Sequence, residues 1–187
     1  NEIWIKAYGE NNHEVGYDVV EIENGGFLIV GYREFYDHAG KDILIIKTDN
    51  NGNKIWEKTI GSKGVYDEIA YSISKSKNYG YIICASTNAT GNNWYDPQII
   101  NVDFDGNIIW NKTYNGSGLK HTRWVATSTN DGGAAILGTT NYYREPGNNE
   151  DAYLIKIDKD GNKLWDYAIQ GGNNDWGWAI IETFLQE

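Results

Sequence analysis

The segment Asp151–Trp165, DAYLIKIDKDGNKLW, contains the pattern that decides the fold. A run rich in Ile, Leu and Val leads to the turn signal Asp-x-x-Gly-Asn, and a Trp follows four residues after the Gly. Alternating apolar residues around such a signal are typical of a β-hairpin. The same pattern recurs at Asp42–Trp56 (DILIIKTDNNGNKIW) and at Asp96–Trp110 (DPQIINVDFDGNIIW), and NEIWIKAYG at residues 1–9 repeats its last part.

The recurring tryptophans are spaced by 52, 54 and 55 residues: Trp4, Trp56, Trp110 and Trp165. A period near fifty in a strand-rich chain predicts a β-propeller. We therefore expect one all-β domain over residues 1–187, built of four-stranded blades of about 52–55 residues. The expected parts are an outer strand at 1–9, complete blades at 14–61, 68–115 and 121–170, and an inner strand at 175–187.

Each repeat offers four candidate strands. The innermost strands are expected at residues 17–23, 70–75, 124–129 and 178–183, followed by short apolar runs after glycine turns, as in strands covered on both faces. The third strand begins at the repeated Asp, and the fourth contains the Trp. We expect these tryptophans to dock between adjacent blades, where burial of one indole contributes roughly 4–6 kcal/mol at most.

The fourth repeat lacks its second and third strands. Two interpretations remain open: the sequence is a piece of a longer propeller, or it is a complete module whose terminal strands pair with a neighbouring subunit. Unpaired strand edges are adhesive, so the second interpretation predicts oligomers or filaments.

Composition excludes several classes of partner. The formal charge of −10 comes from 16 basic and 26 acidic residues, and this argues against a nucleic-acid partner. Every apolar run is far shorter than the roughly 20 residues needed to cross a bilayer, so membrane insertion is not expected. Cys84 is the single cysteine and aligns with Val30 and Leu137, which predicts a buried core thiol and no intrachain disulfide.

The pattern Asp-x-x-Gly-x-x-x-Trp, read in Asp49–Trp56 and Asp158–Trp165, resembles the tryptophan-docking repeat of quinoprotein-like β-propellers. With the Gly-Gly turn of DGGAAILG and the GNKLW segment, it is similar to repeats in secreted and surface proteins of archaea and bacteria. The resemblance covers nearly the whole chain and implies the fold. It leaves the activity open, since such repeats occur in enzymes, scaffolds and adhesive proteins. With one cysteine and few blades, the chain departs from the quinone-dependent dehydrogenases, so no quinone cofactor is expected.

Three variable loops, at residues 33–42, 87–96 and 140–151, are expected on one face. Aromatic rings beside amides and carboxylates suit sugar recognition, because rings stack on apolar sugar faces. The alternative is that these rings cover the ends of the blades. The candidate ligand-binding residues are Phe35, Tyr36, Trp94, Tyr95, Tyr142 and Tyr143.

Two sets of acids recur at aligned positions on the same face. A ring of carboxylates could hold Ca²⁺, which takes six to eight oxygen ligands. The alternative is that these acids accept backbone N–H bonds within loops. The candidate metal ligands are Glu14, Glu68 and Asp175, with His121 at that position in the third repeat, and Asp42, Asp96 and Asp151. No other cofactor is predicted.

No catalytic constellation stands out. The three histidines fall in different loops, and no Ser lies in a nucleophile-elbow context. Sequons at Asn88, Asn111 and Asn115 are compatible with N-glycosylation of an exported chain, and the composition favours an extracellular or cell-surface location.

These observations predict a non-enzymatic extracellular β-propeller that acts as a scaffold, adhesin or self-assembling subunit through its terminal strands. The alternative is a carbohydrate-binding or carbohydrate-cleaving propeller that uses the aromatic loops.

Overall fold

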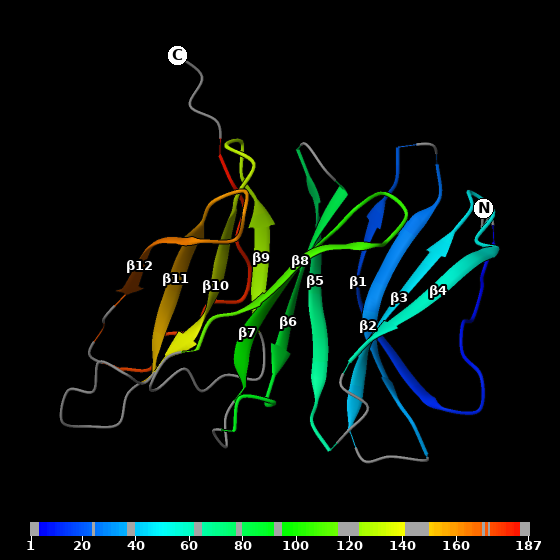
Figure 1. Cartoon of the computed structure of the whole chain (residues 1–187), viewed down its shortest axis with the longest axis horizontal. Coiled ribbons are helices and arrows are strands. Elements are labelled where there is room, and N and C mark those ends of the chain that lie inside the picture. Colours follow the sequence, from blue (N-terminus) through cyan, green and yellow to red (C-terminus); the bar gives the residue numbers. More distant parts are fainter. Residues whose placement is uncertain are drawn as a thin grey trace.

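A computed structural model describes residues 4–23, 25–36, 40–61, 65–77, 80–91, 95–115, 124–140, 150–169, 171 and 173–183. Within these ranges the chain is all-β, and its twelve strands form three separate four-stranded sheets. This confirms the prediction of an all-β chain with one four-stranded unit per repeat. Figure 1 shows the three sheets side by side in chain order.

Every sheet is an antiparallel meander in which neighbours along the chain are neighbours in the sheet. Sheet 1 contains β1 (His13–Glu21), β2 (Phe27–Glu34), β3 (Lys41–Thr48) and β4 (Lys54–Ile60). Sheet 2 contains β5 (Glu68–Ser76), β6 (Gly80–Thr87), β7 (Asp96–Val102) and β8 (Ile108–Thr113). Sheet 3 contains β9 (Val125–Ser128), β10 (Ala134–Thr140), β11 (Asp151–Ile157) and β12 (Lys163–Ile169).

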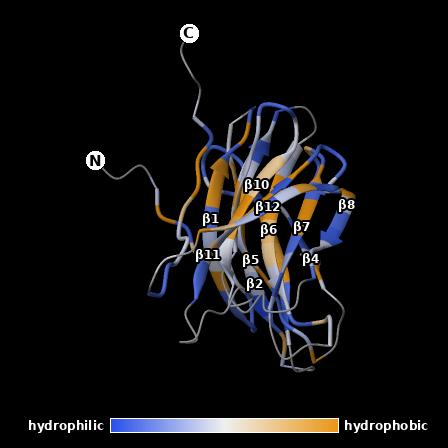
Figure 2. Cartoon of the chain, turned by 90° about the vertical axis from the view of Figure 1, so that its left-hand side faces the viewer, coloured by the Kyte–Doolittle hydropathy of each residue, from blue (hydrophilic) through white to orange (hydrophobic). Residues whose placement is uncertain are grey.

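Two layers of apolar side chains hold the sheets together. One face of sheet 1, with Leu28 and Ile45, packs against Ile83 and Ile100 of sheet 2. The opposite face of sheet 2 packs against sheet 3, for example Cys84 against Ile136. Because both faces of sheet 2 are covered, all eight residues of β6 are buried, which explains the apolar run at residues 81–85. In Figure 2, β6 and β10 accordingly show hydrophobic colours along much of their length.

Cys84 is fully buried in the second of these layers, as predicted for a core thiol. Burial raises the pKa of the thiol, so the reactive thiolate is disfavoured.

The first strands of neighbouring sheets are linked through side chains. The Asp18 carboxylate accepts a hydrogen bond from the Ile73 backbone N–H at 2.9 Å. The Ser72 hydroxyl accepts one from the Ala126 N–H, also at 2.9 Å. These bonds satisfy backbone donors of β5 and β9 that face another sheet rather than a partner strand.

The described parts of the two expected terminal strands form no strand within this chain: residues 4–9 of the outer strand and residues 175–183 of the inner strand. A strand needs a backbone partner, whereas the contacts of residues 4–10 are made by side chains. The innermost strands also differ in extent, because β1 and β5 begin before the expected positions 17 and 70.

Candidate functional site

A tryptophan ring from one repeat lies on the turn glycine of the next sheet. A Cβ added to Gly106 would lie 2.5 Å from Cη2 of Trp56, so only glycine leaves room for the ring. The φ angle of +73° at Gly106 independently favours glycine. The same arrangement places Trp4 on Gly52 and Trp110 on Gly161.

Hydrogen bonds fix the orientation of the docked rings. Trp4 Nε1 donates to the carbonyl oxygen of Asn50 at 3.1 Å, and the Tyr8 hydroxyl donates to the carbonyl oxygen of Gly52 at 2.8 Å. Both bonds recur between sheets 2 and 3 with the same lengths, from Trp110 to Lys159 and from Tyr114 to Gly161. The docking sites of Trp4 and Trp110 are therefore equivalent in their hydrogen bonds.

A lysine two residues after each docked tryptophan binds the same turn. Lys58 Nζ donates to Asn107 Oδ1 at 3.0 Å, and the corresponding pairs are Lys6 with Asn53 and Lys112 with Asn162. Our sequence analysis missed this role, although Trp-x-Lys in three copies and Asn after every turn glycine were the available signals. The fourth copy, Trp165-Asp-Tyr167, has no lysine there.

The turns that receive the rings are rigid. Asp49 Oδ1 accepts hydrogen bonds from the backbone N–H groups of Asn51 and Asn53, while Asp49 Oδ2 accepts one from Asn53 Nδ2. The hydrogen bond from the Asn53 side chain is the main cause of the lowered pKa of Asp49. Asp103 and Asp158 bond their own turns in the same way, so these aspartates act in hairpin turns.

Trp165 differs from the other three, because 49% of its surface is exposed. It lies on β12, the last strand of sheet 3, where Leu164, Tyr167 and Ile169 are exposed as well. Three apolar residues of the following segment are also exposed: Trp176, Trp178 and Ile181.

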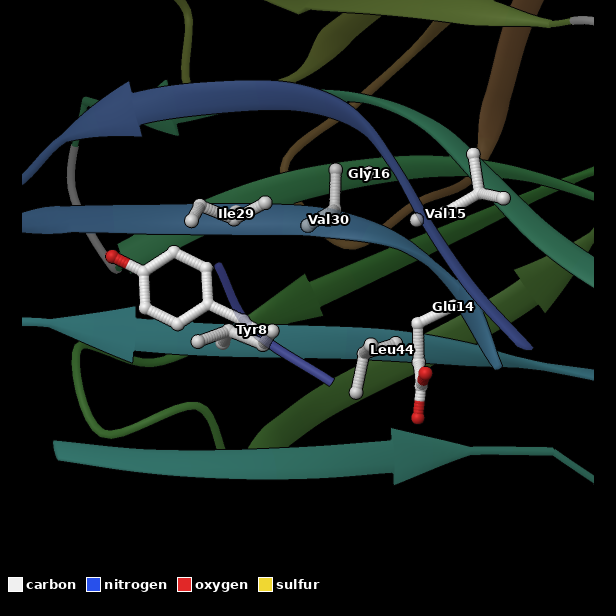
Figure 3. Close-up of a pocket in the computed structure, with 9 residues that line it drawn as sticks. Tyr8, Glu14, Val15, Gly16, Ile29, Val30 and Leu44 are labelled. Atoms are coloured by element: carbon white, nitrogen blue, oxygen red, sulfur yellow. The ribbon is translucent and has the colours of Figure 1, made fainter. Parts of the chain in front are cut away.

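At the other end of the molecule, residues 4–10 lie against sheet 1. Tyr8 contributes to a small, mostly apolar cavity of about 90 Å³ whose wall includes Ile29 and Leu44. Figure 3 shows these three side chains around the cavity, with the Glu14 carboxylate at one end. This outer face of sheet 1 is therefore apolar, like the face of sheet 2 that packs on sheet 1.

A buried ion cluster crosses sheet 1. Arg33 Nε donates to Glu14 Oε1 at 3.0 Å, and Arg33 Nη1 donates to Glu57 Oε1 at 2.8 Å. The Arg33 and Glu14 side chains are only 8% and 9% exposed. Burial acts to lower the pKa of Arg33, but hydrogen bonds to Glu57 and Glu14 outweigh it and raise that pKa. The hydrogen bond from Arg33 in turn lowers the pKa of Glu57.

The predicted metal ligands lie at the ends of the sheets. Cross-strand pairing places Arg33 between Glu14 and Asp42, and Thr87 between Glu68 and Asp96. Asp151 pairs with Thr140 in sheet 3, the Asp175 backbone N–H donates to the carbonyl oxygen of Glu150 at 2.6 Å, and His121 lies outside the described residues. Among the residues that the structure describes, no three acidic, His or Cys side chains are grouped as a metal site. A Ca²⁺ site stays a prediction.

Three of the six predicted ligand-binding aromatics can be placed; Trp94, Tyr142 and Tyr143 lie outside the described residues. The Arg33 guanidinium lies 5.9 Å from the centroid of the Phe35 ring, and Tyr36 is 83% exposed. The Tyr95 hydroxyl donates to Asp67 Oδ2 at 2.6 Å, next to Lys41 at 3.3 Å from the same oxygen. Burial and then this bond raise the pKa of Tyr95, so the phenol stays protonated.

Tyr17 and Tyr71 are aromatics that our sequence analysis did not select. Each is the extra residue of a β-bulge in the first strand of its sheet, between Gly16 and Asp18 in β1 and between Ala70 and Ser72 in β5. Their ring centroids are 4.8 Å apart across the seam between sheets 1 and 2. A bulge re-aims a side chain, and period-2 patterns in sequence do not reveal it.

The three sequon asparagines are all described. Asn88 Oδ1 accepts a hydrogen bond from the Asp67 N–H, and Asn111 Oδ1 accepts one from Gln98 Nε2. Asn111 and Asn115 are exposed, whereas Asn88 is partly buried. Glycosylation at these positions stays a prediction.

Two cavities with mixed polar and apolar linings open on the face that carries the Asp-x-x-Gly-Asn turns. The first, the central cavity, has a volume of about 490 Å³ and lies where the first strands of the three sheets end beside Ile181 and Glu182. The second, the seam groove, has a volume of about 610 Å³ and lies between the turn of sheet 1 and sheet 2. Glu23 lines both. This face is opposite to the one on which the loop aromatics were predicted to bind.

Asp131 next to the central cavity carries a pH-dependent ion pair. Its carboxylate lies 2.8 Å from Lys156 Nζ, and the hydrogen bond from Lys156 is the main cause that lowers the pKa of Asp131 to about 2. Because the pKa of Asp131 is lower in the folded state than its unfolded-state value near 4, the ionised carboxylate stabilises the fold at pH values above 4. This stabilisation is lost as the pH falls through about 2.

We therefore expect Asp131→Asn to lower the free energy of unfolding at pH 7 by at most about 1 kcal/mol, since the carboxylate is about half exposed and solvent screens the pair. The penalty should be much smaller at pH 2. Urea denaturation at the two pH values tests this, with Asp160→Asn as the control for an exposed aspartate that pairs with a neighbouring lysine. An equal penalty at both pH values would contradict the electrostatic explanation.

No protein-family model and no curated protein sequence matches the chain. No helix in the described part of the chain meets the length and hydropathy needed to span a bilayer.

Proposed function

We propose that the chain is a non-enzymatic, self-assembling module of an extracellular β-propeller scaffold. One observation carries the assembly proposal: Trp165 is half exposed, whereas the three equivalent rings each lie on a turn glycine. A side chain of the docking type without a docking partner marks a surface suited to intermolecular contact. Exposed apolar residues on the same strand enlarge that surface: Leu164, Tyr167 and Ile169.

The partner we propose is a second copy of the chain. Trp165 of one copy would dock on an Asp-x-x-Gly-Asn turn of the next, as Trp110 docks on Gly161 within one copy. The turn at Asp49–Asn53 suits this role, because Trp4 occupies it from a segment that forms no strand, and Trp165 of another copy would take its place. The resulting contact is head-to-tail, which gives either closed rings or filaments.

The proposal predicts opposite effects of two substitutions on the same strand. Trp165→Ala should weaken self-association by about tenfold or more, because it removes the ring that docks. Tyr167→Lys should strengthen it, because lysine at this position binds the turn asparagine in all three docked copies. Sedimentation velocity over a concentration series measures both, with Tyr36→Ala as an exposed aromatic control on another surface.

A wild-type chain that stays monomeric at every concentration would contradict the proposal. So would a Tyr167→Lys variant that associates less than the wild type, because that result indicates unspecific attraction between apolar surfaces.

A further inference from the structure

We propose that the central cavity and the seam groove together bind a neutral oligosaccharide. This inference goes beyond self-assembly, and it places the ligand on the face opposite to the aromatic loops. Cavities of 300–1,000 Å³ are typical of small-molecule sites, and both volumes fall in this range.

The charges of the central cavity are balanced. Lys75 Nζ lies 2.6 Å from Glu23 Oε1, and Lys77 Nζ donates to Asn130 Oδ1 at 3.0 Å. Both Glu182 oxygens accept from the Asn130 backbone N–H. Two ammonium groups disfavour a cation, and two carboxylates disfavour an anion. A neutral ligand avoids both penalties.

The polar groups of this cavity suit hydroxyl groups. Lysine only donates hydrogen bonds and glutamate only accepts them, and the hydroxyls of Thr127 and Ser128, which donate to the carbonyl oxygens of Ser128 and Lys75, can still accept. A sugar hydroxyl both donates and accepts, so it can bond to each kind of group. A purely apolar ligand would offer these groups no hydrogen bonds in place of those from water.

The seam groove adds an aromatic platform. Phe104 is 44% exposed and meets the buried ring of Tyr81 edge-on, with centroids 5.9 Å apart at 87°. Lys47 Nζ donates to the Phe104 carbonyl oxygen at 3.1 Å, and the tight Asp103–Gly106 turn holds the residue. A fixed, exposed ring beside amide side chains such as that of Asn51 suits stacking by the apolar face of a sugar.

Glu23 connects the two cavities, since it lines both. A ligand that uses the ring and the central cavity at once must extend past Glu23. A free amino acid can pair with the charged groups of the central cavity, but it does not reach the Phe104 ring in the seam groove. The geometry therefore favours a chain of two or more sugar units over a small zwitterion.

The experiment screens the full chain against an array of neutral oligosaccharides and then titrates the best ligand by calorimetry. We expect binding by the wild type, and a loss of affinity of about tenfold in Phe104→Ala and in Lys77→Ala. Tyr36→Ala, a matched loss of an exposed aromatic in the loop after β2, should leave the affinity unchanged. Melting temperatures check that the variants are folded.

Three results would each overturn the inference: no neutral oligosaccharide binds, Tyr36→Ala abolishes binding while Phe104→Ala does not, or glycine and glutamate displace the sugar from the central cavity. Repeating the titration in Trp165→Ala separates this inference from the assembly proposal. Sugar binding should persist there even though self-association is weakened.

Discussion

Trp110→Ala is expected to lower the free energy of unfolding by about 2–3 kcal/mol, less than the roughly 3–5 kcal/mol for a fully buried aromatic side chain, because the Trp110 ring is partly buried. The ring lies on Gly161, its Nε1 bonds the Lys159 carbonyl, and it packs against the second apolar layer. Its removal opens a gap between sheets 2 and 3. Urea denaturation followed by circular dichroism measures the effect without relying on the fluorescence of the remaining tryptophans.

Trp165→Ala is the matched control, since it removes the same side chain from the same position of a repeat. With 49% of its surface exposed, Trp165 should contribute less than about 1 kcal/mol in the monomer. The denaturation is therefore run at low protein concentration. Equal losses of unfolding free energy in the two variants would show that the tryptophan stabilises the fold through contacts within its own sheet rather than by docking on the next turn.

The repeat pattern was sufficient to predict the four-stranded units, because the turn signal fixes a hairpin locally and the apolar runs fix buried strands. It was not sufficient for the chain ends. Residues 4–9 have the sequence of a fourth strand but form no strand, since strand formation depends on a neighbour that local sequence does not specify.

The candidate site was harder to predict for the same reason. The docking lysines are visible as a repeated Trp-x-Lys pattern, but their partners lie about fifty residues away. Phe104 occupies a turn position that is Lys159 in the next repeat, so no repeat signal marks it as part of a groove.

The ion cluster on sheet 1 could not be predicted from local sequence either, because Arg33 pairs with Glu57 across the sheet rather than with a neighbour in sequence. We expect Arg33→Met to lower the free energy of unfolding at pH 7 by about 3 kcal/mol. The substitution keeps most of the side-chain volume but leaves the buried Glu14 carboxylate without its cation. Chemical denaturation measures the loss.

The triple variant Arg33→Met, Glu14→Gln and Glu57→Gln should recover much of this stability, because it removes the uncompensated charges together with the cation.

The pH dependence of the stability difference between wild type and Arg33→Met provides a further test. Arg33 lowers the pKa of Glu57, so this contribution is present above the unfolded-state value near 4.5 and is lost as pH falls through the folded-state value. The gap between wild type and Arg33→Met should therefore narrow in acid. A gap that stays constant down to pH 3 would assign the role of Arg33 to the packing of its methylene groups instead of its charge.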